Sequence, residues 1–143
     1  MVNTPDKEPI YSYTYTLRSR YGETDQMGYV YYGRYLDYFE VARTEMIRDL
    51  GVSYSKLEEE GFMLPVIYAQ ISYKSPIYYD EEMNITVLLF RKPRVKLETF
   101  YEIRTSRGSA PRASGQVNLC FVDKETRKPC MGPDYFLRLF DHT

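Results

Sequence analysis

Two acidic residues stand in a loop directly ahead of a predicted helix. Glu23 and Asp25 lie within GETDQMG, residues 22–28, and a helical pattern follows. The first turn of a helix presents unpaired N–H groups and a partial positive charge. Those groups, here the amides of residues 31–34, can hold a carbonyl oxygen that becomes negative during acyl transfer. A carboxylate beside them can act as a general base on water or attack the carbonyl itself.

The same loop has a purely structural interpretation. An Asp shortly before a helix most often caps the helix or forms a turn by accepting hydrogen bonds from amides. Residue type and spacing alone favour this structural role. The pattern therefore leaves both roles open for Asp25.

The sequence lacks the residues that other common catalytic centres need. The two cysteines, Cys120 and Cys130, form no CxxC pair, and the single histidine, His142, stands next to the C-terminus. A zinc site needs His and Cys at set spacings, and a histidine-based triad needs a His in the cleft. We therefore expect no metal site and no cofactor. Cys120 fits a buried strand residue better than a nucleophile, and His142 fits a frayed tail.

The elements around the loop follow from hydrophobic periodicity. Ile10–Tyr21 alternates with a period of two, which predicts a strand with one buried face. After the loop the period becomes helical, and an apolar stripe runs through Tyr35, Phe39, Ala42, Met46 and Leu50. Gly51 is placed to end this helix, and a second short helix is expected over Ser53–Glu60.

Charged residues of the long helix are expected on its exposed surface. Asp37, Glu40 and Arg43 lie off the apolar stripe. Their spacing of three residues allows contact between them on a helix surface.

From Pro65 onward the pattern is that of strands. Four stretches alternate between apolar and polar residues, at 67–74, 83–90, 95–104 and 114–121, and the tail 133–140 could add a helical turn. The connections are short, so successive strands are expected to be antiparallel neighbours. One amphipathic helix and one antiparallel sheet make an α+β layer arrangement. The 16 tyrosines are interpreted mostly as residues of half-buried strands.

The sheet face away from the helix is expected to be partly apolar. The strand positions on that face include Val66, Tyr68, Leu88, Phe90, Phe100 and Val122. A second subunit is the cover that we expect for such a face.

Length and charge restrict the class of protein. The chain has 143 residues, which fits a single domain over 1–143, with about 1–9 and 141–143 expected to be flexible. A formal net charge of −1 argues against a nucleic-acid partner. The polar opening MVNTPDKEP lacks the apolar core of a signal peptide, and no run is apolar enough for a membrane span. A cytoplasmic location is therefore expected.

The segment around the acidic loop carries a denser pattern over about thirty residues. It resembles the signature of the 4-hydroxybenzoyl-CoA thioesterase family, and more closely that of its YbgC-like acyl-CoA thioesterase branch. The residues that carry the resemblance are Tyr21, Glu23-Thr24-Asp25, Gly28, Val30-Tyr31, Gly33, Tyr35, Phe39-Glu40 and Ala42-Arg43-Thr44-Glu45.

The resemblance implies a hotdog fold, in which an antiparallel sheet wraps around a long helix and chains pair into dimers or tetramers with the cleft at the subunit interface. It implies that Asp25 is the catalytic carboxylate and that the backbone N–H groups near Tyr32 and Gly33 polarise the thioester carbonyl. Tyr21 matches an aromatic position that lines the site. The implied substrate is an acyl-CoA, with an acyl carrier protein as the alternative thioester carrier.

The chain departs from the branch at three positions. Glu23 replaces the first Asp of the Asp-Thr-Asp pattern, and Tyr32 stands where the branch often has His, so no imidazole takes part. Lys96 replaces a Ser at the turn before the third of the four strands. Arg94 and Lys96 belong to a basic turn that could bind the phosphates of CoA, although a solvated turn has the same composition.

Competing functions remain. A hotdog hydratase or dehydratase generally needs a His in the cleft, which disfavours it here. A non-catalytic acyl-thioester-binding or scaffold protein is the stronger alternative, because a fold alone does not fix an activity. Another branch of hotdog enzymes uses a Glu on the long helix, a position that Glu40 or Glu45 could take.

Overall fold

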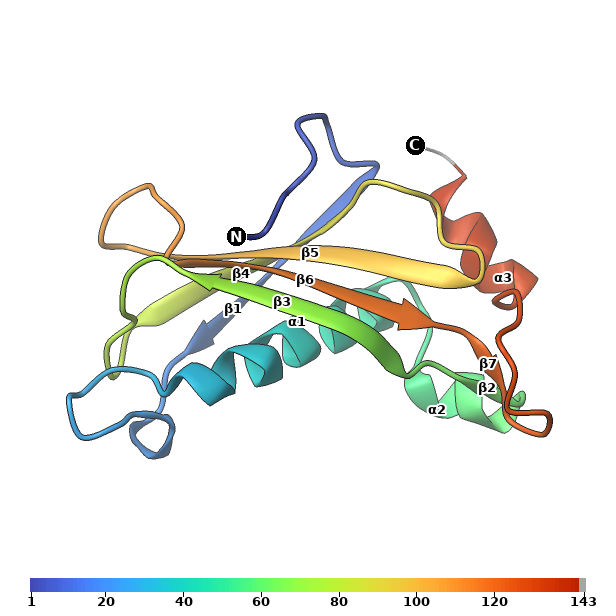
Figure 1. The fold of residues 1–143 in the computed structure, drawn as a ribbon, viewed down its shortest axis with the longest axis horizontal. Coiled ribbons are helices and arrows are strands. Elements are labelled where there is room, and N and C mark those ends of the chain that lie inside the picture. Colours follow the sequence, from blue (N-terminus) through green and yellow to red (C-terminus); the bar gives the residue numbers. More distant parts are fainter. Residues whose placement is uncertain (142–143) are drawn as a thin grey trace.

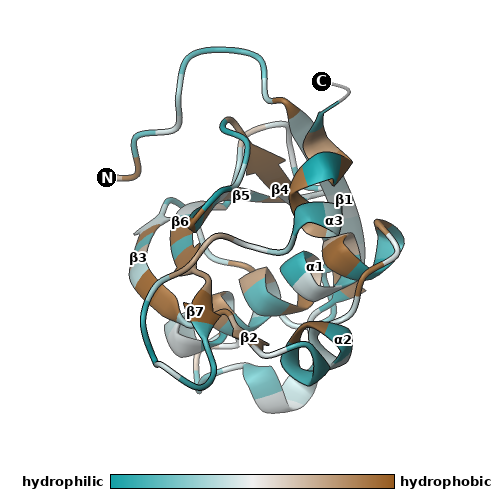
Figure 2. Cartoon of the chain, turned by 90° about the vertical axis from the view of Figure 1, so that its right-hand side faces the viewer, coloured by the Kyte–Doolittle hydropathy of each residue, from teal (hydrophilic) through white to brown (hydrophobic). Residues whose placement is uncertain are grey.

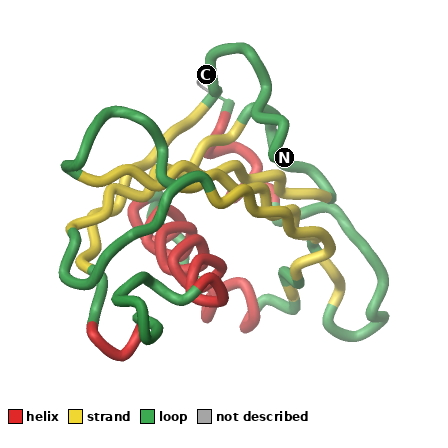
Figure 3. The backbone as a smooth tube through the Cα atoms, turned by 60° about the vertical axis from the view of Figure 1, so that its left-hand side comes forward, coloured by secondary structure: helices red, strands yellow, loops and turns green. Residues whose placement is uncertain are grey.

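The structure, a computed structural model, describes residues 1–141. A five-stranded antiparallel sheet packs on one long helix, which lies along one face (Figures 1 and 3). The helix is α1 (Tyr35–Asp49), and the strands are β1 (Tyr11–Arg18), β3 (Val66–Tyr73), β4 (Glu82–Leu89), β5 (Lys96–Thr105) and β6 (Ala113–Cys120). The expected α+β class is confirmed.

Smaller elements close the ends of this arrangement. Two short 3-10 turns, η1 (Tyr21–Glu23) and η2 (Tyr32–Arg34), lie before α1. After it come α2 (Tyr54–Glu59) and a two-stranded pair of β2 (Phe62–Met63) with β7 (Val122–Asp123). The chain ends in α3 (Asp134–Leu137) and η3 (Arg138–Phe140), so the helical turn expected in the tail is confirmed.

The strand order is β1-β4-β5-β6-β3. The hairpins β4–β5 and β5–β6 agree with the expectation that short turns join antiparallel neighbours. That expectation is wrong for β3 and β4, which follow each other in sequence but are not neighbours in the sheet. β4 pairs with β1 instead, and β3 pairs with β6. The connection 74–81 is not a tight turn: it runs beside residues 28–30, where Val30 N donates to Ile77 O at 2.7 Å.

The core forms where α1 packs on the sheet. Four of the five stripe residues, all but the half-buried Leu50, are fully or almost fully buried. Gly51 ends α1 with φ +90°, a left-handed conformation that suits glycine. Ser53 caps α2 by accepting from Lys56 N at 3.2 Å, as the sequence predicts.

The closest approach of α1 to the sheet depends on a glycine. An added Cβ at Gly115 of β6 would lie 2.2 Å from Cε2 of Phe39. The Phe39 ring, which is fully buried, stacks on Tyr101 of β5 with centroids 4.4 Å apart. The absence of a side chain at Gly115 therefore sets the distance between helix and sheet.

Arg43 is buried rather than exposed, so the surface position expected for it is wrong. Its Nε donates to the hydroxyl of Tyr54 and its Nη1 to the hydroxyl of Tyr101, both at 3.1 Å. Asp37 pairs instead with Arg34. Two tyrosine hydroxyls thus satisfy a cation in the interior, which spacing along the helix does not reveal.

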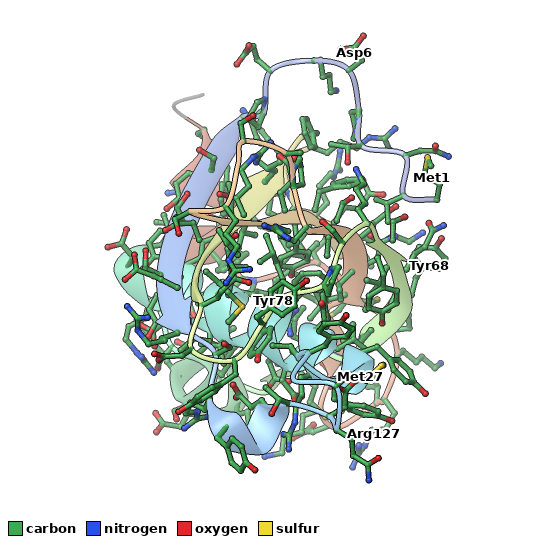
Figure 4. The ribbon with its side chains drawn as sticks, turned by 90° about the vertical axis from the view of Figure 1, so that its left-hand side faces the viewer. Met1, Asp6, Met27, Tyr68, Tyr78 and Arg127 are labelled. Carbon is green, nitrogen blue, oxygen red and sulfur yellow. The ribbon has the colours of Figure 1, made fainter. Side chains whose placement is uncertain are left out.

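The N-terminal segment crosses the sheet face away from α1 (Figure 4, Met1 and Asp6). Val2 packs with Phe90 and Phe100, and its N–H donates to Oγ of Ser72 at 2.8 Å. This part of the outer face is therefore covered by the same chain, whereas we expected a second subunit there. The flexibility expected for residues 1–9 and 141–143 stays a prediction, and residues 142–143 lie outside the described residues.

Candidate functional site

The acidic loop joins β1 to α1. After η1, Thr24 and Val30 form an antiparallel bridge, and the residues between them make a tight loop. Asp25 N donates to Tyr29 O at 2.7 Å, and Gly28, with φ +80°, closes the turn by donating to Asp25 O. The chain then enters η2 and continues directly into α1, so Asp25 is held beside the start of the helix.

The Asp25 carboxylate has one engaged oxygen and one free oxygen. Its Oδ1 accepts from the N–H groups of Met27 and Tyr29, at 2.8 and 3.2 Å. This is the turn-forming role that the loop pattern favours on residue type alone. Within residues 1–141 no group hydrogen-bonds to Oδ2, and the side chain is half-buried. Asp25 is therefore oriented by its own loop and still has an oxygen available for a ligand or a water.

Two amides at the helix start are open. Of the four amides expected at the oxyanion site, Tyr31 N donates to Glu23 O and Arg34 N donates to Tyr31 O. The N–H groups of Tyr32 and Gly33 have no acceptor among the described residues. An added Cβ at Gly33 would lie 2.6 Å from Cε2 of Tyr31, so glycine leaves this turn uncrowded. The open donors are thus those of the two residues that the sequence singled out.

Asp25 and Tyr32 line one cavity of about 370 Å³. Its other walls include the rings of Tyr35 from α1 and Tyr73 from the end of β3, and they continue through residues 29–30 of the loop and 74–76 of the connection after β3. The Tyr73 hydroxyl donates to Tyr32 O at 3.1 Å, which ties η2 to β3. Burial, with the nearby Tyr73, raises the pKa of Tyr35 to about 12, so its phenol stays neutral. The cavity thus places several tyrosine rings beside the Asp25 carboxylate and beside Tyr32, the first residue of η2.

A second cavity, of about 560 Å³, also has Asp25 in its lining. It is lined by Tyr21 and Tyr79, whose rings meet edge to face with centroids 5.7 Å apart, and by residues of the loop. Both tyrosines are largely exposed. Asp25 is the one lining residue that the two cavities share.

Comparison with known proteins identifies the family of this chain. The thioesterase-like superfamily matches residues 19–140. The chain belongs to this superfamily. The match covers the acidic loop, α1 and four of the five strands of the sheet, β3 to β6, and begins just after β1.

Individual relatives agree. The Bacillus subtilis protein YneP is 40% identical over 79% of this chain and 81% of its own length. The acyl-CoA thioesterase YbgC of Haemophilus influenzae is 30% identical over 91% of this chain and 95% of its own. A DHNA-CoA thioesterase from Staphylococcus aureus superposes with a TM-score of 0.78 at 32% identity, over 84% of this chain and 80% of that one. The resemblance to the YbgC-like branch and the hotdog fold are thereby confirmed.

Residues that sequence analysis missed complete the site of this thioesterase-superfamily member. Tyr73 and Tyr79 come from β3 and the connection after it, about fifty residues beyond the loop. Tyr38 comes from α1 and binds Glu23. The only sequence signal was the abundance of tyrosine, which did not say which rings would meet.

Arg94 and Lys96 lie at the other end of the sheet. Because β1 and β4 are antiparallel, the loop after β1 adjoins the start of β4, whereas the basic turn follows its end. The eight residues of β1, at about 3.3 Å each, separate the two ends by roughly 25 Å. Both side chains line a cavity of about 230 Å³ with Arg91 and Lys92. One chain therefore brings Asp25, Tyr32, Gly33 and Tyr21 together, but not the basic turn.

The remaining candidates lie elsewhere. Cys120 is buried, as expected, and His142 lies outside the described residues. Glu45 pairs with Arg48, and Glu40 is exposed on α1. In the described part of the chain, no group of three His, Cys, Asp or Glu residues could hold a metal ion, and no helix could span a membrane.

Proposed function

We propose that this protein is an acyl-CoA thioesterase in which Asp25 drives hydrolysis and the amides of Tyr32 and Gly33 polarise the thioester carbonyl. The observation that carries the proposal is the free Oδ2 of Asp25 beside a cavity that also reaches the open helix start. Among the relatives, the acyl-CoA thioesterase YbgC supports the proposal, because it aligns with this chain over nearly its whole length.

In this mechanism the carbonyl oxygen accepts hydrogen bonds from the two amides. A water attacks the carbonyl carbon while Asp25 takes its proton, and the tetrahedral oxyanion is held at the helix start. The C–S bond then breaks, CoA leaves as the thiol with that proton, and the free acid remains. In the alternative route Asp25 Oδ2 attacks the carbon itself, the C–S bond breaks and CoA leaves as the thiolate, and water then hydrolyses the resulting anhydride to the free acid and the Asp25 carboxylate.

The two routes differ in the fate of the water oxygen when water attacks the aspartyl carbonyl of the anhydride. A single turnover in ¹⁸O-labelled water, with enzyme in excess, labels only the product acid if Asp25 is a base. Attack by Asp25 followed by hydrolysis at the carboxylate side leaves label in the enzyme, where mass spectrometry of the peptide containing residue 25 detects it.

The main experiment measures CoA release with a thiol reagent across a panel of acyl-CoAs. We expect Asp25→Asn to lower kcat by about 10²–10⁴-fold, which is the usual contribution of a general base. Asp134→Asn is the matched control, because that carboxylate lies on α3 and pairs with Arg138. Equal rates for wild type and Asp25→Asn would remove Asp25 from the mechanism.

A non-catalytic acyl-thioester-binding protein is the second candidate. The engagement of Asp25 Oδ1 by two amides of its own loop favours it, since a turn former needs no catalytic task. Tight binding of acyl-CoA by the wild type without release of CoA would support this reading.

The proposal includes a homodimer or homotetramer, an acyl-CoA substrate and a cytoplasmic location, with acyl carrier protein as the alternative carrier. β3 is an edge of the sheet, and parts of its ribbon carry the hydrophobic colour (Figure 2). Three consecutive large side chains at its start, Val66, Ile67 and Tyr68, are exposed. Such an edge invites strand pairing with a second copy. In a dimer, Arg94 and Lys96 would serve the site of the other subunit by binding CoA phosphates, which one chain alone does not allow.

A further inference from the structure

The loop that carries Asp25 is tied to α1 by a buried hydrogen bond. Tyr38 lies on the first turn of α1 and is 1% exposed. Its hydroxyl donates to Oε1 of Glu23 at 2.9 Å. The same oxygen accepts from Arg20 N at 2.8 Å, and the Arg20 guanidinium reaches Oε2 at 3.3 Å. The Glu23 carboxylate is thus held by three donors, one of them from the helix.

Both partners keep the protonation states that this bond needs. Burial, followed by the hydrogen bond to Glu23, raises the pKa of Tyr38, so the phenol remains a donor. Burial also raises the pKa of Glu23, but the hydrogen bonds from Arg20 and Tyr38 outweigh it and leave the pKa below its usual value. A bond from a neutral hydroxyl to a carboxylate is charge-assisted and stronger than a neutral pair.

The main chain of Glu23 holds the other side of the site. Its carbonyl accepts from Tyr31 N at 2.8 Å, directly before the open amides. The next residue, Thr24, bridges to Val30, and Asp25 follows with its own bond to Tyr29 O. Glu23 therefore joins three parts: α1 through its carboxylate, the helix entry through its carbonyl, and Asp25 two residues along the chain.

We infer that Tyr38 and Glu23 are positioning residues, which fix the distance between the Asp25 carboxylate and the amides of Tyr32 and Gly33. The inference rests on the proposed function. Neither residue lines the two cavities at Asp25, so neither touches the substrate in one chain. A displacement of about 1 Å at a catalytic group costs up to 10²-fold in rate, so a link of this kind has a measurable effect.

The test replaces the phenol and keeps the ring. Tyr38→Phe is expected to lower kcat about 10–100-fold with little change in KM. Tyr135→Phe is the matched control: its hydroxyl also donates to a carboxylate, that of Glu60, but between α3 and the end of α2, at the other end of the molecule (Figure 1). Unchanged kcat in Tyr38→Phe would overturn the inference.

Two further readouts separate positioning from general loss of stability. Amide hydrogen exchange is expected to become faster at Asp25 and Tyr31 in Tyr38→Phe, but not in β4 or β5. In an Asp25→Asn background, Tyr38→Phe is expected to cause no further loss in rate, because it acts through Asp25. Unaltered exchange at Asp25 and Tyr31, or an equal loss in both backgrounds, would overturn the inference.

The outcome also distinguishes this inference from the proposed function. If Asp25→Asn hydrolyses acyl-CoA as fast as wild type, the proposed role of Asp25 fails, whatever exchange shows for the link. If Asp25→Asn is inactive but Tyr38→Phe is as fast as wild type, the role of Asp25 stands and the positioning role of Tyr38 and Glu23 fails.

Discussion

Replacement of Gly115 by Ala should push α1 away from the sheet. The new methyl carbon would lie 2.2 Å from Cε2 and 2.6 Å from Cζ of Phe39, whereas carbon atoms in contact lie about 3.5–4.0 Å apart. One of the groups must therefore move by more than about 1 Å. The Phe39 ring has little room to turn, because it is fully buried and stacked on Tyr101.

Overpacking of a core in this way costs about 1–3 kcal/mol. At about 2–4 °C per kcal/mol for a chain of this size, the melting temperature of Gly115→Ala should fall by about 2–12 °C. Denaturant unfolding and calorimetry measure both quantities. Gly22→Ala is the matched control, because the same methyl there meets nothing within 4 Å.

A double mutant tests the cause of this loss. A smaller residue at position 39 should make room for the methyl, so Phe39→Leu combined with Gly115→Ala should lose less stability than the two single changes summed. Strict additivity, or a Gly115→Ala variant as stable as wild type, would refute the argument that this glycine sets the distance between helix and sheet.

Three further changes have defined outcomes. Arg94→Ala with Lys96→Ala should raise KM for acyl-CoA but not for the same acyl group on N-acetylcysteamine, which has no phosphates; equal effects on both substrates would exclude a phosphate role. Glu23→Gln should make the free energy of unfolding depend less on pH in the acid range. Burial raises the pKa of Glu23, but its hydrogen bonds bring that pKa below the usual 4.5. The carboxylate therefore stabilises the fold above about pH 4.5, and this contribution is lost as the pH falls through the folded-state pKa. Unfolding measured from pH 7 to 3 checks this, and an unchanged slope would contradict it. Tyr101→Phe should cost about 1–3 kcal/mol in denaturant unfolding, because it leaves the buried Arg43 with one hydroxyl partner fewer, and a neutral effect would argue against that bond.

Local periodicity was sufficient for the elements near the site. The alternation at the start of the chain and the helical stripe after the loop predict β1 and α1, since both depend only on which residues face the core. The end of α1 at Gly51 and the cap of α2 at Ser53 follow from local backbone chemistry. The loop with Asp25 and a helix start at residues 31–34 could be placed for the same reason, whereas the family resemblance was needed to single out the amides of Tyr32 and Gly33.

What could not be predicted depends on contacts between distant segments. The position of β3 at the edge requires β1 to occupy the place beside β4, and periodicity within a strand does not encode its neighbours. Arg43 becomes a core residue only because Tyr54 and Tyr101 bring hydroxyls to it. The cover of the outer face by Val2 likewise depends on a segment without regular structure.

Several tyrosines have a structural role that strand propensity does not predict. Several of the 16 could have been phenylalanine if their only task were to fill the core. Instead the hydroxyl of Tyr38 binds the loop, that of Tyr73 binds the helix entry, and those of Tyr54 and Tyr101 bind Arg43 inside the core. Each of these bonds joins α1 or its entry to another element, so phenols fix the start and the middle of the helix. Because the proposed oxyanion site is the start of that helix, its precision depends on hydrogen bonds that a phenylalanine core would lack, and the Tyr38→Phe experiment examines the bond nearest to Asp25.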